Sequence, residues 1–134
     1  MSPLTYHMVD DGPDAVGYFS HAVEADGWLF FAGQIASGET GEPLPDGIEA
    51  QARKTLDNVV SVLKGVGCGV ENVASVRIFL TNLEADWPTV NRIYQEYFPE
   101  THKPARTTVG VTALALGGLI EIDVVARRSD QNSG

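Results

Sequence analysis

Two charged residues near the C-terminal end of the chain have side chains with complementary chemistry. Arg106 lies in the segment PARTTVGV and Glu121 in the segment GGLIEIDVVA, and both segments show the two-residue period of a β-strand. A guanidinium is a permanently charged, forked donor suited to a carboxylate, and a glutamate among isoleucines is a candidate proton acceptor. An anion clamp and a general base on one sheet predict a site for a small acidic metabolite.

The elements that must position these side chains follow from hydrophobic periodicity and turn residues. Alternation in some segments and apolar spacing at three and four residues in others predict the order β-β-β-α-β-α-β-β. The Asp26-Gly27 dipeptide is typical of a two-residue hairpin turn. The last two strands, around Arg106 and Glu121, are expected to be joined by a small-residue loop. The earlier strands are expected at residues 4–9, 19–25, 27–34 and 73–80, and the helices at 48–64 and 85–98.

This order predicts an α+β fold in which both helices cover one face of a single mixed, six-stranded sheet. The segment GWLFFAGQ, residues 27–34, is apolar on both faces and is expected to be buried on both. The face of the sheet that the helices leave bare is not polar enough to lie in water. We therefore expect the chain to associate with other copies of itself.

Length and composition describe an ordinary globular domain. The 134 residues suffice for one domain with a substantial core, expected over residues 1–128, followed by a flexible tail at 129–134. No apolar run approaches the roughly 20 residues that a membrane span needs, and the N-terminal sequence lacks the regions of a secretory signal. The only cysteine, Cys68, cannot form an internal disulfide, which favours a reducing compartment. We expect a cytoplasmic protein.

Charge and ligand spacing exclude other classes of function. The net charge is −9, from 18 acidic and 9 basic residues, and the basic residues form no stripe, so a nucleic-acid partner is not expected. His7, His21 and His102 show no ligand-like spacing, and we expect neither a metal nor another cofactor. A diffuse negative charge does not exclude a small anionic substrate, because one nearby arginine can outweigh it.

Several segments of the chain resemble the RidA/YjgF family of reactive intermediate deaminases, also called endoribonuclease L-PSP. The PAR motif that ends at Arg106 and the IEI motif centred on Glu121 are the most specific part of the resemblance. It covers most of the chain, because further similar segments follow one another in the same order. These segments are AVGYFSHAV, FAGQI, AQARKTLDNV and TVNRIYQEYF.

The resemblance implies a chorismate-mutase-like α+β domain that forms a homotrimer around a central β-barrel, with ligand clefts between subunits. It also implies the hydrolysis of reactive enamines and imines, such as 2-aminoacrylate, to 2-oxo acids and ammonia. By the family pattern, Arg106 would bind the substrate carboxylate and Glu121 would direct the attacking water. The same pattern places Gly33 and Asn91 in the pocket.

Three pocket positions differ from the family pattern. Aligned without a gap, the family's tyrosine, serine and cysteine correspond here to Phe19, Ala32 and Thr108, and Tyr18 is adjacent to Phe19. The loss of hydroxyls at Phe19 and Ala32 removes hydrogen bonds and makes the pocket more apolar. A substrate with a larger or less polar side chain is therefore expected.

Other interpretations of the same residues stay open. Arg106 is compatible with a structural salt bridge, and Glu121 with the solvent face of an edge strand. Asn91 is compatible with helix capping, and Phe19 with simple packing. The alternatives to an imine deaminase are a non-catalytic binder of small carboxylates, a deaminase of a larger pathway-specific enamine, and the ribonuclease activity of some family members. The acidic composition argues against the ribonuclease.

The spacing of the last two strands gives one geometric expectation. If their loop centres near Ala115, Arg106 lies level with Val124, three residues beyond Glu121. That offset is about 10 Å along the strand direction, which is long for a compact site within one hairpin. We therefore expect a neighbouring subunit to supply one of the two residues.

Overall fold

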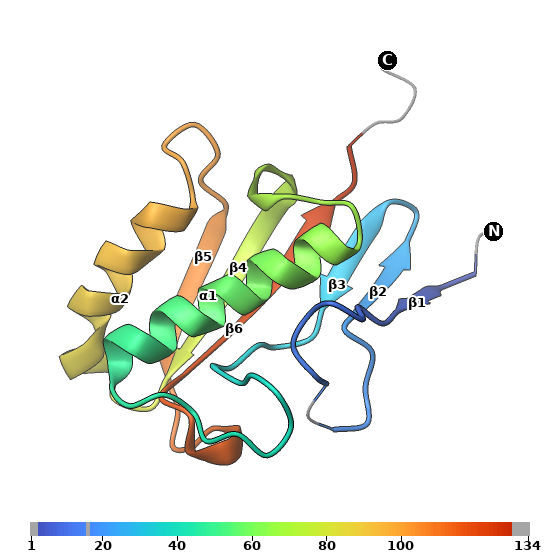
Figure 1. Ribbon diagram of the computed structural model, residues 1–134. Coiled ribbons are helices and arrows are strands. Elements are labelled where there is room, and N and C mark those ends of the chain that lie inside the picture. Colours follow the sequence, from blue (N-terminus) through green and yellow to red (C-terminus); the bar gives the residue numbers. More distant parts are fainter. Residues whose placement is uncertain (1–2, 16, 130–134) are drawn as a thin grey trace.

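The computed structural model describes residues 3–15 and 17–129, and the segment predicted as a tail lies almost wholly outside them. Two helices lie side by side on one face of a mixed six-stranded sheet (Figure 1). The strand order in the sheet is β1-β2-β3-β6-β4-β5. The elements are β1 (Thr5–His7), β2 (Ala22–Ala25), β3 (Trp28–Phe31), α1 (Ile48–Gly65), β4 (Val73–Leu80), α2 (Leu83–Tyr97), β5 (Ala105–Gly110) and β6 (Ile120–Arg127). The predicted α+β fold with both helices on one face of a mixed six-stranded sheet is confirmed, and the trimer around a central barrel stays a prediction.

The hairpin of β2 and β3 turns where the sequence predicts. Ala25 pairs with Trp28, and the two residues between them have positive φ angles, 53° at Asp26 and 85° at Gly27. Two such residues in succession match the type I′ turn, whose twist suits two antiparallel strands. The strands are shorter than predicted, because β2 begins at Ala22 instead of residue 19.

Helix α1 owes its position to an apolar stripe and its end to a glycine. Leu56, Val59 and Leu63 recur at three- and four-residue spacing and are buried against the sheet. At the C-terminal end Gly67 has a φ of 84°. The Cys68 N–H donates to the Leu63 carbonyl at 2.9 Å and the Gly67 N–H to the Lys64 carbonyl at 3.0 Å. These two bonds form a Schellman motif, which explains why the glycine-rich segment at residues 65–69 follows helix α1.

The last two strands do not pair with each other, contrary to the prediction. β4 lies between them, parallel to β5 and antiparallel to β6. The physical reason is the crossover through α2, which carries the chain over the face of the sheet and returns it parallel to β4 at the outer edge. The chain then passes through a short 3₁₀ turn, Ala115–Gly117, to reach the other side of β4.

The core lies between the helices and one face of the sheet, and the other face is bare in the single chain. Leu29 is fully buried, but its neighbours Trp28 and Phe30 on the opposite face are 39% and 52% exposed. The prediction that residues 27–34 are buried on both faces is therefore wrong for the isolated chain. Among the described helices, none is long and apolar enough to cross a membrane. The cytoplasmic location stays a prediction.

Candidate functional site

The strand register places the two predicted key residues on opposite faces of the sheet. Arg106 pairs with Val76 on β4, and Val76 is buried beneath the helices. Glu121 pairs with Phe79, three positions further along β4 and therefore on the other face. The two residues thus belong to one sheet, as expected, but face opposite sides of it.

The two residues are also far apart within one chain. Val76 pairs with both Arg106 and Val124. Arg106 therefore lies level with Val124, as predicted, but β4 separates the two strands. Three residues along the strands and two strand spacings across them separate the Cα atoms of Arg106 and Glu121 by roughly 14 Å. A single subunit does not bring them together.

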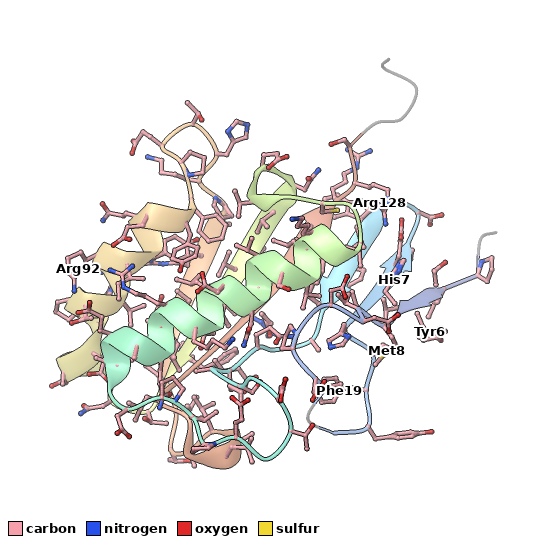
Figure 2. All side chains as sticks on the ribbon, viewed as in Figure 1. Tyr6, His7, Met8, Phe19, Arg92 and Arg128 are labelled. Carbon is pink, nitrogen blue, oxygen red and sulfur yellow. The ribbon has the colours of Figure 1, made fainter. Side chains whose placement is uncertain are left out.

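Glu121 lies in a small cavity beside the bare face of the sheet. The cavity has a volume of about 190 Å³, which suits a metabolite smaller than a drug-sized ligand. Predicted pocket residues Phe19, Ala32 and Gly33 share its wall with Glu121, and Figure 2 shows Phe19 on the loop after β1. The remaining lining residues are Asp14, Ala15, Gln34, Ile35, Ser37 and Ala115.

A β-bulge gives the cavity its shape. Phe30 pairs with Val125 and Gln34 pairs with Ile122. Between these two pairs the chain advances four residues after β3 but only three along β6, so one residue on the β3 side has no partner. The extra residue lies in the segment that contains Ala32 and Gly33. Bulges of this kind bend a strand and redirect its side chains, and here the bend turns Gly33 toward Glu121.

Gly33 is required by the position of the Glu121 side chain. A Cβ atom at this position would lie 2.9 Å from the Glu121 Cδ atom and closer still to Oε2. Glycine therefore lets the carboxylate rest directly against the backbone. The sequence comparison with the family pattern marks the same glycine as a pocket residue, and the close approach gives the physical reason.

The surroundings of Glu121 favour a stronger base. Partial burial raises the pKa of its carboxyl above the ordinary value of 4.5, and the negative charge of Asp123 raises it further. Asp123 itself is held in a two-point ion pair with Arg77, at 2.7 and 2.9 Å. Within the described residues, no side chain or backbone group hydrogen-bonds the Glu121 carboxylate. It is free to bind a water molecule.

The wall of the cavity is fixed by buried hydrogen bonds. Asn58 of α1 donates to the carbonyls of Ile35 and Ser37 at 2.9 and 2.7 Å. On the other side, the Val9 N–H donates to Nδ1 of buried His21, so Nε2 carries the proton and donates to the Pro13 carbonyl at 2.7 Å. Asn58 and His21 thus hold the two loops that line the cavity.

Arg106 lies on exposed edge strand β5 and is held by an aromatic ring. Its guanidinium carbon is 4.8 Å from the centre of the Tyr94 ring, and Tyr94 stacks in turn on Phe98 at 4.6 Å. Within residues 3–15 and 17–129, Arg106 makes no ion pair. A cation–π contact leaves the in-plane N–H donors free, so the guanidinium is available to a carboxylate.

Two polar groups on the same side of the sheet have no partner. The Thr108 Oγ1 and the Tyr94 hydroxyl are buried without a hydrogen bond in the described part of the chain. Burial raises the pKa of Tyr94 to about 12, although the charge of Arg106 acts in the opposite direction. Asn91 lies one helical turn before Tyr94 on α2 and is half-buried. Arg106, Thr108 and Asn91 thus form a second group, separate from the Glu121 cavity.

Two residues near the site were missed by the sequence interpretation. Tyr94 follows the apolar spacing of α2, and no sequence signal connects it with Arg106. Asp14 lines the cavity, but in the sequence it stands in a polar segment with the composition of a turn. Within the described residues, no group of three or more His, Cys, Asp or Glu side chains is arranged to hold a metal ion.

Comparison with known proteins places this arrangement in a family. The profile of the endoribonuclease L-PSP family matches residues 9–128. The chain belongs to this family. A RutC family protein from Synechocystis is 43% identical over 116 residues, which are 85% of this chain and 88% of that protein. The resemblance to RidA/YjgF proteins is therefore confirmed.

Other relatives of the endoribonuclease L-PSP family differ in what is known of them. A Bos taurus protein named 2-iminobutanoate/2-iminopropanoate deaminase is 35% identical over 129 residues, 94% of this chain and 93% of that protein. A crystal structure of a Rid-family protein of unknown function from Yersinia pestis has a TM-score of 0.86 and 36% identity, covering 93% of this chain and 99% of that one. The family is shared, but the activity of this chain is not fixed by it.

Proposed function

We propose that the protein is an imine deaminase that hydrolyses 2-imino acids and their enamine tautomers to 2-oxo acids and ammonia. The observation that carries the proposal is the partly buried Glu121 carboxylate, which faces a small cavity without a hydrogen-bond partner. The name of the bovine relative supports the same reaction. No cofactor is required, because imines react with water without one.

The complete site is proposed to lie between two subunits. Glu121, Gly33, Ala32 and Phe19 would come from one subunit, and Arg106, Thr108 and Asn91 from a second copy. The bare sheet face, with Trp28 and Phe30 exposed, supports association of copies. A closed ring such as the expected trimer gives each Glu121 cavity one Arg106 edge.

The reaction then follows from the chemistry of these groups. Arg106 holds the substrate carboxylate through its forked N–H donors, with the Thr108 hydroxyl and backbone near Gly33 assisting. Glu121 takes a proton from a bound water, whose oxygen adds to the imine carbon and forms a carbinolamine. A proton passes to the nitrogen, the C–N bond breaks, and ammonia leaves as the C=O bond forms. Holding one water and one carboxylate in place suffices for this undemanding reaction.

The rate of hydrolysis of an unstable imine tests the proposal. A threonine dehydratase generates the enamine of 2-iminobutanoate in the assay, and the rate of 2-oxobutanoate formation is followed with and without the protein. We expect acceleration by the wild type and a loss of about 10²-fold or more for Glu121→Gln. Asp123→Asn is the matched control, because it removes the neighbouring carboxylate and should retain most of the activity. Binding of 2-oxobutanoate without any acceleration would instead support the non-catalytic binder.

A further inference from the structure

The Asp14 carboxylate at the mouth of the Glu121 cavity is held by hydrogen bonds from Thr40, and His21 is the one basic residue that acts on its charge, without forming an ion pair, in the described part of the chain. Its Oδ2 atom accepts hydrogen bonds from the Thr40 N–H at 2.9 Å and the Thr40 hydroxyl at 2.8 Å. These two bonds lower the pKa of Asp14 below the ordinary value, so the group stays ionised at neutral pH. In the described part of the chain, no Lys, Arg or His forms an ion pair with it. Its Oδ1 atom is left over for a ligand.

Asp14 lies where the cavity opens into a wider surface groove. The groove has a volume of about 840 Å³ and shares Asp14, Ala15 and Phe19 with the cavity. Its other lining residues include Tyr6, Met8 and Tyr18. Figure 2 shows Tyr6 and Met8 on the same side of the molecule as Phe19. A molecule bound at Glu121 can therefore extend past Phe19 into the groove.

Three of the nine residues that line the groove are aromatic, and all three side chains are exposed. Tyr6 is 65% exposed, Phe19 is 44% exposed, and Tyr18 is fully exposed. Ring faces carry negative charge density and attract cations, and a carboxylate beside them adds its own attraction. Aromatic rings around an unpaired carboxylate are the chemistry that binds an ammonium or guanidinium group.

The charged residues that line the cavity also favour a positively charged ligand group. Its lining contains two carboxyl groups, Asp14 and Glu121, and no basic side chain. In the proposed assembly Arg106 of the second copy neutralises the substrate carboxylate at the inner end. At the outer end Asp14 would repel a second acidic group and attract a positive one.

The geometry points to a cation subsite at Asp14, so that the preferred substrate is a 2-imino acid whose side chain ends in an ammonium or guanidinium group. This inference rests on the proposed function and refines it. The side chain would pass Phe19, pair with Asp14 Oδ1 and lie against the ring faces of the groove. The reaction at the imine carbon is unchanged, since the cation takes no part in it.

Two substrates of equal shape and different charge separate this inference from its rivals. An L-amino acid oxidase with catalase converts arginine and citrulline to their imino acids, which differ only in a guanidino or a neutral ureido group. We expect a kcat/KM for the guanidino imine that is about five- to tenfold higher, the combined effect of one exposed ion pair and one cation–π contact. The ratio of the two rates corrects for differences in the amount of folded protein.

Variants then assign the preference to Asp14. Asp14→Asn should lower the guanidino-to-ureido ratio to about twofold, the part left by the cation–π contact. Thr40→Val should lower the ratio in part, because it removes one of the two hydrogen bonds. Glu39→Gln is the matched control: Glu39 is an exposed acid that lines neither the cavity nor the groove, and its loss changes the net charge equally. That variant should keep the wild-type ratio.

The outcomes distinguish the inference from the function on which it rests. A wild-type ratio of one or less, with full activity on 2-iminobutanoate, overturns the cation subsite and leaves the deaminase in place. A high ratio that persists in Asp14→Asn assigns the preference elsewhere and also overturns it. Failure to accelerate the hydrolysis of any imine overturns both.

Discussion

The Glu121 cavity and the Arg106 edge differ in how completely one chain builds them. The cavity is formed within the subunit: a bulge presents Gly33 to the carboxylate, and buried bonds from Asn58 and His21 fix its walls. At the edge, Arg106 lies on an exposed strand with an aromatic ring as its support and no anion beside it. One chain therefore positions the Glu121 base completely, whereas Arg106 lacks an anion to bind within its own chain.

A second arginine shows what a structural role looks like in the same molecule. Arg128, labelled in Figure 2, donates to both carboxylate oxygens of Glu24 at 2.8 and 2.9 Å, and to the Val66 carbonyl at 2.7 Å. Its donors are used inside the chain, and the hydrogen bonds from Arg128, helped by one from His7, lower the pKa of Glu24 to about 2. Arg106 has no such partners, and this contrast favours a ligand-binding role.

The largest expected effect comes from removing each arginine in turn. Arg106→Ala should lower kcat/KM by about 10²-fold, mainly through KM, because a charge-assisted two-point contact with the carboxylate is lost. Its thermal midpoint should stay close to the wild type. Arg128→Ala should show the reverse, with about 1–3 kcal/mol less stability and near-normal kcat/KM for the folded fraction. Thermal denaturation and steady-state kinetics on both variants measure these effects. Equal changes in stability and kcat/KM for the two variants would contradict the different roles of the two arginines.

A side chain at Gly33 should displace the Glu121 carboxylate and lower the activity. Gly33→Ala places a methyl group against the Glu121 carboxylate, which must rotate away. We expect kcat to fall about tenfold or more with a smaller change in KM, because the base is displaced while Arg106, the main group that binds the carboxylate, is unchanged. Gly27→Ala is a control for the substitution itself, since a Cβ there meets no neighbouring atom, although its positive φ costs some stability. A normal kcat in Gly33→Ala would show that the contact is irrelevant.

A smaller effect is expected from the ring that supports Arg106. Tyr94→Leu removes the cation–π contact, worth about 0.5–1 kcal/mol, and should raise KM two- to fivefold with kcat unchanged. Tyr94→Phe keeps the ring and removes a buried hydroxyl that has no partner, so KM should stay normal and stability should not fall. A raised KM in both variants would mean that the hydroxyl, and not the ring, serves the site.

The smallest expected effect is on the pH dependence of kcat/KM, which reports the pKa of Glu121. The pKa of Glu121 is raised by burial and by Asp123, so kcat/KM should fall with decreasing pH around a value above 4.5. Asp123→Asn should move this fall to lower pH. A carboxyl whose pKa is raised in the folded state costs stability above that pKa, and the cost disappears as pH falls toward 4.5. Glu121→Gln should accordingly stabilise the protein at neutral pH and much less in acid, which pH-dependent unfolding measures.

The sequence predicted those elements whose pattern is set by local residues. β4 has the predicted bounds, and α1 differs by one residue, because alternation and an uninterrupted apolar stripe define them. The Asp26-Gly27 turn was equally clear, since its two residues can adopt positive φ angles. The level of Arg106 with Val124 was predicted correctly for the wrong reason, as both strands are aligned by β4.

Long-range features could not be predicted in the same way. A small-residue loop such as that between β5 and β6 can close a hairpin or cross a neighbouring strand, and only packing of α2 decides which. The bulge at Gly33 depends on pairing with β6, which lies about 90 residues later in the chain. Tyr94 fits the buried stripe of a helix equally well with or without an arginine above it.

Mixing two inactive variants measures most directly whether the site is shared between subunits. Glu121→Gln and Arg106→Ala chains are unfolded together in equal amounts, refolded and assayed against each variant refolded alone. If each site combines Glu121 of one copy with Arg106 of another, about one site in four is intact in a random mixture, and about a quarter of the wild-type activity returns. If both residues act within one chain, every chain lacks one of them. The mixture would then be as inactive as its components, and the shared site would be ruled out.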